Sequence, residues 1–221
     1  MSYTNKIPLG IIGSSGGSAL AAASECLKKS GRDIEWIVVT DRKCGLGMWA
    51  IKNGYNFHQI EYTNADEFSM QAAAIFSQAN CQSVLLFYTK RVSCALIDNL
   101  NVWNIHPSIL PSFPGLNGLK DAICYGVKIF GATLHRVNAE LDKGQIFAQV
   151  ATNLPEDCPY SQLENISFRH KVWLTLVWFD ILKNCNERPA FDQSGFGIDL
   201  CSPGLADRKM KKIFMQWLSN L

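Results

Sequence analysis

Short apolar runs alternate with longer amphipathic stretches through the first half of the chain, and this alternation most constrains what the chain can fold into. We expect strands at residues 8–13, 34–40, 83–87 and 102–105, with a short one near Phe57, and helices at residues 18–30, 46–53, 65–79 and near Leu96. Such βαβ alternation predicts an α/β fold with a mainly parallel sheet, helices on both faces and ligands at the carboxyl ends of the strands.

The pattern changes in the second half of the chain. A helix at residues 120–125 precedes two expected strands, 129–137 and 145–151, which read as a hairpin-like pair. Ser161 and Glu164 form a capping-box pattern before a long apolar helix that is expected to end near Asn184. One stripe of apolar residues predicts a terminal amphipathic helix: Met210, Ile213, Phe214, Trp217 and Leu218. The segment 186–207 shows no regular pattern.

The composition bounds the architecture and the partners. A chain of 221 residues, 48% hydrophobic and 18% charged, fits one globular domain, or one domain with a small appendage. The formal net charge of +2 gives no electrostatic preference for nucleic acid or for an anionic membrane. Because the apolar run after Lys6 breaks at Gly13, we expect neither a signal peptide nor a membrane span, and we expect a cytoplasmic protein.

The cysteines and histidines give no sign of a metal site. The eight cysteines contain no Cys-x-x-Cys pair, and the four histidines contain no His-x-x-x-His pair. Scattered cysteines of this kind are typical of reduced, mostly buried thiols. We therefore expect no metal.

A glycine-rich turn, residues 13–18, separates the first expected strand from the first expected helix. Free backbone amides and the helix dipole favour an anion at such a turn, so Gly16, Gly17 and Ser18 are candidates to hold a phosphate group. The pattern is neither a full Gly-x-Gly-x-x-Gly fingerprint nor a Walker loop. The alternative is a tight turn in which Ser18 caps the helix, and the sequence leaves both open.

A second candidate site lies at the end of the strand expected at residues 102–105. Asn104 and His106 are two residues apart, so the period of a strand points both side chains to one face. Pro107 favours an extended backbone at His106, and further prolines stiffen the turn that follows. The plainer interpretation is a histidine whose hydrogen bonds are satisfied by backbone. An amide and an imidazole at this edge of the sheet favour a ligand site.

Two segments resemble the signature of the 10-formyltetrahydrofolate-dependent formyltransferases, especially its glycinamide ribonucleotide transformylase branch. They are NIHPSILPSFPG at residues 104–115 and GATLHRVNAELDKGQIFAQ at residues 131–149. The resemblance implies a Rossmann-like formyltransferase fold over residues 1–184, with residues 185–221 as a C-terminal extension that holds the terminal helix. It also implies a role in one-carbon metabolism and purine biosynthesis.

The resemblance implies that Asn104, His106 and Asp142 are the catalytic residues. An amine would attack the formyl carbon, and Asn104 and protonated His106 would stabilise the oxyanion of a tetrahedral intermediate. Asp142 would act through His106 and a proton-carrying water. Without the resemblance, Asp142 before Lys143 reads as an ordinary turn residue. His135 also matches the family pattern, but as a strand residue it is left outside the catalytic set.

The resemblance further implies that 10-formyltetrahydrofolate binds as the formyl-donating cosubstrate. Its pterin would meet loop backbone after the strand at 83–87 and the loop before Asp142, as well as Asn104. The residues in these two loops are Thr89, Lys90, Arg91, Val92, Asn138, Ala139 and Glu140. Lys90 and Arg91 could equally be solvated turn residues.

Two departures from the family pattern concern the amine acceptor. Ala19 stands where the transformylases have asparagine after the glycine-rich turn, and Arg169 stands where they have an acidic residue. The default acceptor is glycinamide ribonucleotide, a small phosphorylated amine. The alternatives are another amine, such as a nucleotide-linked amino sugar, or a folate- or nucleotide-binding module without activity. The oligomeric state stays open, a homodimer included.

Overall fold

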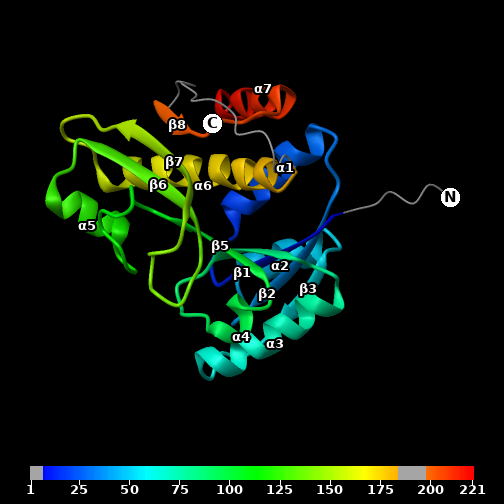
Figure 1. Cartoon of the computed structure of the whole chain (residues 1–221). Coiled ribbons are helices and arrows are strands. Elements are labelled where there is room, and N and C mark those ends of the chain that lie inside the picture. Colours follow the sequence, from blue (N-terminus) through cyan, green and yellow to red (C-terminus); the bar gives the residue numbers. More distant parts are fainter. Residues whose placement is uncertain (1–6, 184–197) are drawn as a thin grey trace.

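The structure is a computed structural model that describes residues 7–183 and 198–221. Within these residues one mixed sheet has the strand order β3-β2-β1-β4-β5-β6-β7-β8 (Figure 1). The strands are β1 Ile7–Gly13, β2 Ile34–Thr40, β3 Asn56–Gln59, β4 Ser83–Phe87, β5 Asn101–His106, β6 Ile129–Arg136, β7 Ile146–Asn153 and β8 Leu200–Ser202. The helices are α1 Ser18–Lys29, α2 Gly45–Lys52, α3 Ala65–Gln78, α4 Cys94–Ile97, α5 Gly118–Tyr125, α6 Tyr160–Lys183 and α7 Arg208–Leu218.

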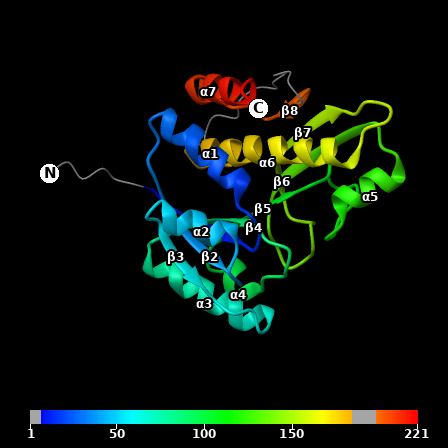
Figure 2. The same ribbon diagram turned by 180° about the vertical axis from the view of Figure 1, so that it is seen from behind.

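The strands from β3 to β5 pair in parallel, as the alternation predicts. The inner strands β1, β2 and β4 are nearly continuous apolar runs because helices cover both of their faces. Helices α1, α2, α6 and α7 contribute to the hydrophobic cluster on one face, and α3 and α4 to the cluster on the other (Figure 2). The expected α/β fold is confirmed, and the carboxyl ends of β1, β4 and β5 lie at one edge of the sheet.

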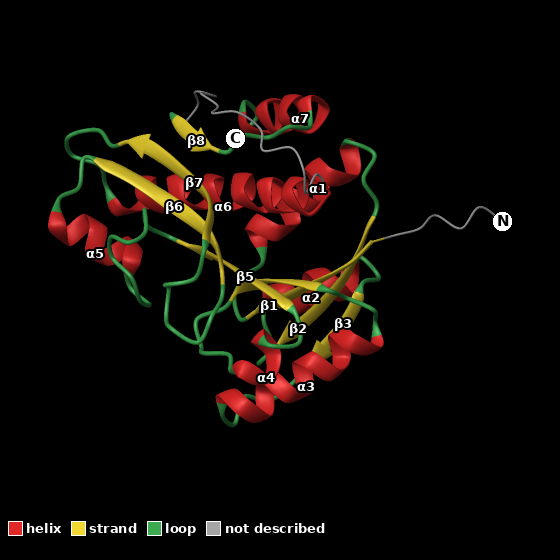
Figure 3. Cartoon of the chain, in the orientation of Figure 1, coloured by secondary structure: helices red, strands yellow, loops and turns green. Residues whose placement is uncertain are grey.

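The second half of the sheet is antiparallel. Strand β6 pairs with β5 and with β7, and a register shift between Leu134 and His135 interrupts the β6–β7 ladder. The expected hairpin is therefore present, with bounds that differ by one or two residues. The short strand β8 was not expected, and it adds an antiparallel edge beside β7 (Figure 3).

The predicted capping box of α6 is wrong, and so is the alternative in which Ser18 caps α1. Helix α1 begins at Ser18 with Gly17 as its N-cap, so Ser18 lies inside the first turn and its hydroxyl does not cap the helix. Helix α6 begins at Tyr160, and the carbonyl of Pro159 accepts from the backbone N–H of Gln162. Ser161 is thus already helical and does not form the expected capping box.

The described C-terminal residues pack against the rest of the fold. Met210, Phe214 and Leu218 form the buried stripe of α7, as predicted, and join the main hydrophobic cluster. Trp173 Nε1 on α6 donates to Cys201 Sγ on β8 over 2.8 Å, and Arg32 forms an ion pair of 2.7 Å with Asp207. The boundary at residue 184 stays a prediction, because residues 184–197 lie outside the described part. None of the described helices is both long and apolar enough to cross a membrane.

Candidate functional site

The predicted catalytic residues meet where β5 and β6 pair. In the antiparallel register Asn104 lies opposite His135 and His106 lies opposite Thr133. Trp103 and Ile105, the alternate residues of β5, point into the core that α6 covers, so Asn104 and His106 point to the other face, as the strand period predicts. His106 is buried and Asn104 is half-buried.

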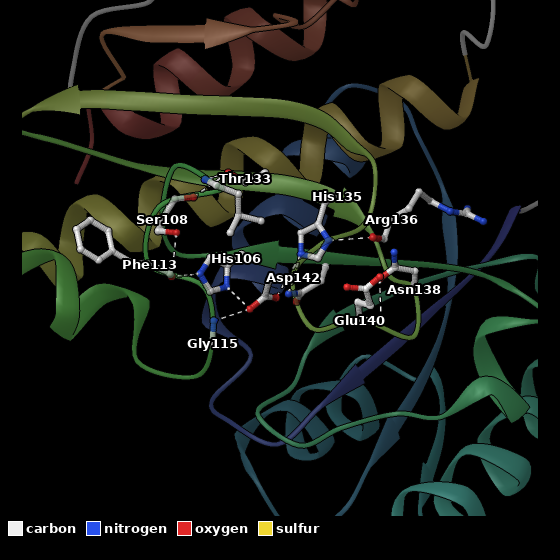
Figure 4. A network of polar contacts seen from close by, with 12 residues as sticks. His106, Ser108, Phe113, Gly115, Thr133, His135, Arg136, Asn138, Glu140 and Asp142 are labelled. Atoms are coloured by element: carbon white, nitrogen blue, oxygen red, sulfur yellow. Dashed lines mark hydrogen bonds and ion pairs between the residues drawn. The ribbon is translucent and has the colours of Figure 1, made fainter.

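Asp142 joins them from the β6–β7 loop and lies between two histidine rings (Figure 4). Its Oδ2 accepts from the backbone N–H of Gly115 over 2.7 Å and lies 3.4 Å from His106 Nδ1. Its Oδ1 lies 3.6 Å from His135 Nε2. The backbone of Asp142 has φ +54°, in the left-handed region that aspartate tolerates better than most residues. The loop conformation therefore aims a buried carboxylate at His106.

The second nitrogen of His106 faces a backbone carbonyl. Nε2 lies 2.7 Å from the carbonyl oxygen of Phe113, which can only accept, so Nε2 carries the proton of this hydrogen bond. In the neutral ring Nδ1 then holds the lone pair. A proton taken up by the ring arrives on Nδ1 and points toward Asp142. The arrangement fixes which atom of His106 exchanges a proton with the site.

His135 holds the amide of Asn104. Its Nδ1 lies 2.9 Å from the carbonyl of Arg136, so Nδ1 donates, and its Nε2 accepts from Asn104 Nδ2 over 3.3 Å. Burial lowers the pKa of His135, while the Arg136 carbonyl and the Asp142 carboxylate oppose that shift. A neutral His135 leaves the second N–H of Asn104 for another acceptor. The prediction placed His135 outside the catalytic set, because a histidine on a strand can equally be a core residue, although its match to the family pattern was a signal for the contacts with Asn104 and Asp142 that the structure has.

The glycine-rich turn lies at the same edge of the sheet, between β1 and α1. Gly17 has φ +71° and provides no side-chain cap, and Ser15 accepts through its carbonyl from Leu46 N–H over 3.0 Å. The amides of the first turn of α1, at Ser18 and Ala19, precede the helical hydrogen-bond ladder and are available to an anion. The side chain of Ala19 is buried, so this position offers backbone only.

The segment after β4 forms an ion pair with the loop that follows β2. Lys90, a predicted cosubstrate ligand, forms an ion pair of 2.7 Å with Asp41 and lies over the ring of Tyr62, 4.2 Å from its centroid. Arg42 also pairs with Asp41 over 2.8 Å. Burial raises the pKa of Asp41, but the hydrogen bonds from Arg42 and Lys90 outweigh burial and hold it below its ordinary value. The charged group of Lys90 is therefore already paired with Asp41.

The other predicted cosubstrate residues lie on exposed loop surface. Thr89 and Arg91 are exposed and Val92 is half-buried, beside the end of β5 because β4 and β5 pair. In the β6–β7 loop Asn138, Ala139 and Glu140 are exposed. The Asn138 side chain accepts from the backbone N–H of Glu140 over 3.1 Å, and Glu140 pairs with Lys143 over 2.7 Å. Residues 89–92 therefore border the carboxyl end of β5. The loop at 138–140 begins beside Val102, whose carbonyl accepts from Val137 N–H, and it reaches His106 through Asp142.

Arg169 does not join this cluster. It is half-buried and lines a groove of about 510 Å³ together with Thr152, Asn153 and Asp199. The Thr152 hydroxyl lies 2.8 Å from His170 Nε2 on α6, which places the groove on the face of the sheet that α6 covers. Asn104 and His106 point to the other face. Among the described residues no group of histidine, cysteine, aspartate and glutamate side chains could hold a metal ion.

The fold and this cluster match a known class of proteins. Residues 9–172 match the model of the formyl transferase family, and the chain belongs to this family. A glycinamide ribonucleotide transformylase structure from Symbiobacterium toebii is similar, with a TM-score of 0.70 and 26% identity over 78% of this chain and 86% of that chain.

Curated relatives match over shorter segments. A phosphoribosylglycinamide formyltransferase from Mycobacterium tuberculosis (strain CDC 1551 / Oshkosh) is 56% identical over 46 residues, 21% of either chain. A formyltetrahydrofolate deformylase from Synechocystis is 35% identical over 100 residues, 43% of this chain and 35% of that one. The matched segments thus span a fifth to about a third of these relatives.

Proposed function

We propose that this protein is an enzyme that transfers a formyl group from 10-formyltetrahydrofolate to the primary amine of glycinamide ribonucleotide. The observation that carries the proposal is the convergence of Asn104, His106 and Asp142 at the end of β5, in a chain of the formyl transferase family. A solved structure with the same fold and a curated relative are both named for action on glycinamide ribonucleotide. The amino-sugar alternative has no observation in its favour.

The first step is attack of the unprotonated amine on the formyl carbon. A C–N bond forms, the carbonyl electron pair moves onto oxygen, and a tetrahedral intermediate results. The oxyanion needs donors in place before the charge develops. The free N–H of Asn104 and a proton on His106 Nδ1 are these donors. His135 orients the first by accepting the other Asn104 N–H, and the Phe113 carbonyl orients the second.

The second step breaks the bond between the formyl carbon and N10 of the folate. The attacking nitrogen loses one proton and N10 gains one, so the net reaction moves a proton without a change in redox state. His106 Nδ1 and Asp142 lie 3.4 Å apart and form the route, with a bridging water as carrier. These groups handle both the oxyanion and the proton, so the proposal invokes no metal.

Both substrates are assigned places around this centre. The pterin would lie against the backbone of residues 89–92 and 138–140, and the charged side chain of Lys90 would hold the loop rather than the ligand, because Asp41 already pairs with it. The acceptor phosphate would lie on the amides of Gly16, Gly17 and Ser18. Residues 89–92 and the glycine-rich turn both follow strands that end at the same edge of the sheet, β4 and β1, and Asp142 connects the loop at 138–140 to His106.

The partners in this proposal are small molecules only. A net charge of +2 suits a phosphorylated metabolite without favouring nucleic acid or a membrane surface, and a cytoplasmic location suits purine biosynthesis. Ala19 removes a side-chain contact to the phosphate but keeps the backbone amides. We therefore keep glycinamide ribonucleotide as the acceptor.

The test is an acceptor panel with 10-formyltetrahydrofolate. We expect tetrahydrofolate to form with glycinamide ribonucleotide and not with amino-sugar nucleotides. Formate is measured in parallel without any amine, because a relative is named a deformylase. Release of formate at the same rate with and without amine would assign a hydrolase, and turnover only with an amino sugar would replace the acceptor.

A further inference from the structure

Two residues in strained backbone flank the ring of His106. Phe113 has φ +51° and Asp142 has φ +54°, and neither is glycine. Phe113 provides the carbonyl at Nε2, and Asp142 provides the carboxylate near Nδ1. A left-handed backbone costs a bulky residue such as phenylalanine about 1 kcal/mol or more, and such outliers gather at functional sites when their surroundings hold them. At Phe113, the group whose position depends on this strained backbone is the carbonyl that faces His106 Nε2.

The hydroxyl of Ser108 holds this carbonyl from a second side. Ser108 is 2% exposed, and its one proton is shared between the carbonyls of Ser112 and Phe113, the latter at 3.2 Å. The Phe113 oxygen thus accepts from both His106 Nε2–H and Ser108 Oγ–H (Figure 4). Because the Ser108 proton is committed to carbonyls, the hydroxyl is not set up as a nucleophile.

Ser108 is itself fixed to β6 and β7. Its carbonyl accepts from the Thr133 hydroxyl over 2.7 Å, and the same hydroxyl accepts from Leu110 N–H over 3.0 Å and from Gln149 Nε2 over 3.1 Å. Gln149 also donates to the Leu110 carbonyl over 2.9 Å. These hydrogen bonds therefore attach the turn that carries Phe113 to β6 and β7.

We infer that Ser108 is a positioning residue for His106. By holding the Phe113 carbonyl in its strained conformation, Ser108 keeps the proton of the neutral ring on Nε2 and leaves Nδ1 as the atom that exchanges a proton with the substrate side. The inference rests on the proposed function for its catalytic consequence. Its structural content, the tautomer of His106, is independent of any substrate.

The test compares three variants of the full chain. Ser108→Ala removes the hydroxyl. Ser108→Thr restores it, and its extra methyl has room because Ser108 borders an apolar cavity of about 170 Å³. Ser112→Ala is the matched control, since it removes an exposed hydroxyl of the same turn while leaving the carbonyl that Ser108 uses. Ser108→Cys, with a weaker donor of similar size, replaces Ser108→Ala if that variant does not fold.

The primary readout is the pair of ¹⁵N chemical shifts of the two ring nitrogens of His106, recorded at a pH at which the ring is neutral. We expect one Nε2–H tautomer in the unchanged protein, in Ser108→Thr and in Ser112→Ala, and a mixture of tautomers in Ser108→Ala. The kcat of Ser108→Ala should fall about five- to tenfold, the equivalent of one hydrogen bond, with KM for the amine unchanged.

An unchanged tautomer in Ser108→Ala would overturn the inference, even if kcat fell. A tautomer mixture in the unchanged protein would overturn it too. If the unchanged protein formylates no amine, the proposed function fails, yet the shifts of His106 still decide the role of Ser108. The two failures are therefore distinguishable.

Discussion

Replacing Asp142 with asparagine removes the negative charge of the site and keeps the conformation of the loop. The left-handed backbone at Asp142, with φ +54°, suits asparagine as well as aspartate. The amide oxygen can still accept from Gly115 N–H, which donates to Asp142 over 2.7 Å. The variant therefore keeps the loop in place and removes the negative charge that lies 3.4 Å from His106 Nδ1.

The magnitude follows from the interaction that is lost. A hydrogen bond to a charged group contributes about 1.5–3 kcal/mol, against about 1 kcal/mol for a neutral one. Loss of the Asp142 charge removes this difference, about 0.5–2 kcal/mol, from the stabilisation of the His106 donor in the transition state, and loss of the proton route adds a general acid–base factor of about 100. We expect kcat to fall by about 200- to 3,000-fold, the product of these two effects. The free energy of unfolding should fall by no more than about 1 kcal/mol.

The assay is single-turnover formylation of glycinamide ribonucleotide, with unfolding in denaturant measured on the same preparations. Asp121→Asn is the matched control, because Asp121 is an exposed carboxylate on α5. It should leave both quantities unchanged. A kcat of Asp142→Asn within twofold of the unchanged protein would refute the assignment of Asp142 to the proton route.

Three further predictions concern other parts of the site. Burial lowers the pKa of His135 from its ordinary 6.5, so the contribution of a neutral His135 to the free energy of unfolding is complete above that pH and is lost as the pH falls through the folded-state pKa. In denaturant unfolding, His135→Gln should lose less stability over this pH range than the unchanged protein. An equal loss in both proteins would contradict this prediction. A Cβ at Gly144 would lie 1.6 Å from the Arg136 carbonyl oxygen, so Gly144→Ala should cost about 3 kcal/mol of unfolding free energy by the same method; a loss below about 0.5 kcal/mol would show that the loop adapts. Gly17→Ala strains a residue at φ +71° whose Cβ would lie 2.9 Å from Leu46 Cα, and it should raise KM for the phosphorylated acceptor but not for the folate; equal rises in both would count against phosphate binding at this turn.

Much of the fold could be predicted because its signals are local. The buried parallel strands are continuous apolar runs, and the terminal helix carries its apolar stripe in the spacing of Met210, Phe214 and Leu218. Strand β8 could not be predicted, because three residues from Leu200 to Ser202 are too few to show a period and their pairing with β7 is a tertiary contact. The capping box predicted for α6 and the Ser18 cap left open for α1 are both absent, because Gly17 and Pro159 precede these helices and offer only backbone groups.

The candidate site, like the fold, could be predicted from the sequence only in part. The spacing of Asn104 and His106 predicts their common face, whereas the approach of Asp142, 36 residues after His106, could be expected only from the resemblance. The Phe113 carbonyl could not be predicted at all, since a backbone oxygen has no residue-type signal. Lys90 was expected at the ligand, but its partner Asp41 lies on another loop, and the sequence contains no sign of that pairing.

Transfer of a labelled formyl group tests the central claim most directly. 10-Formyltetrahydrofolate labelled with ¹³C in the formyl carbon is mixed with excess enzyme and glycinamide ribonucleotide, and the label is followed into the amide product for the unchanged protein and for His106→Ala. The account predicts that the label appears on the amine within one turnover, and that His106→Ala, although folded, slows transfer by about 100-fold or more. Label that stays on the folate in the unchanged protein, or equal rates in the two proteins, would contradict it.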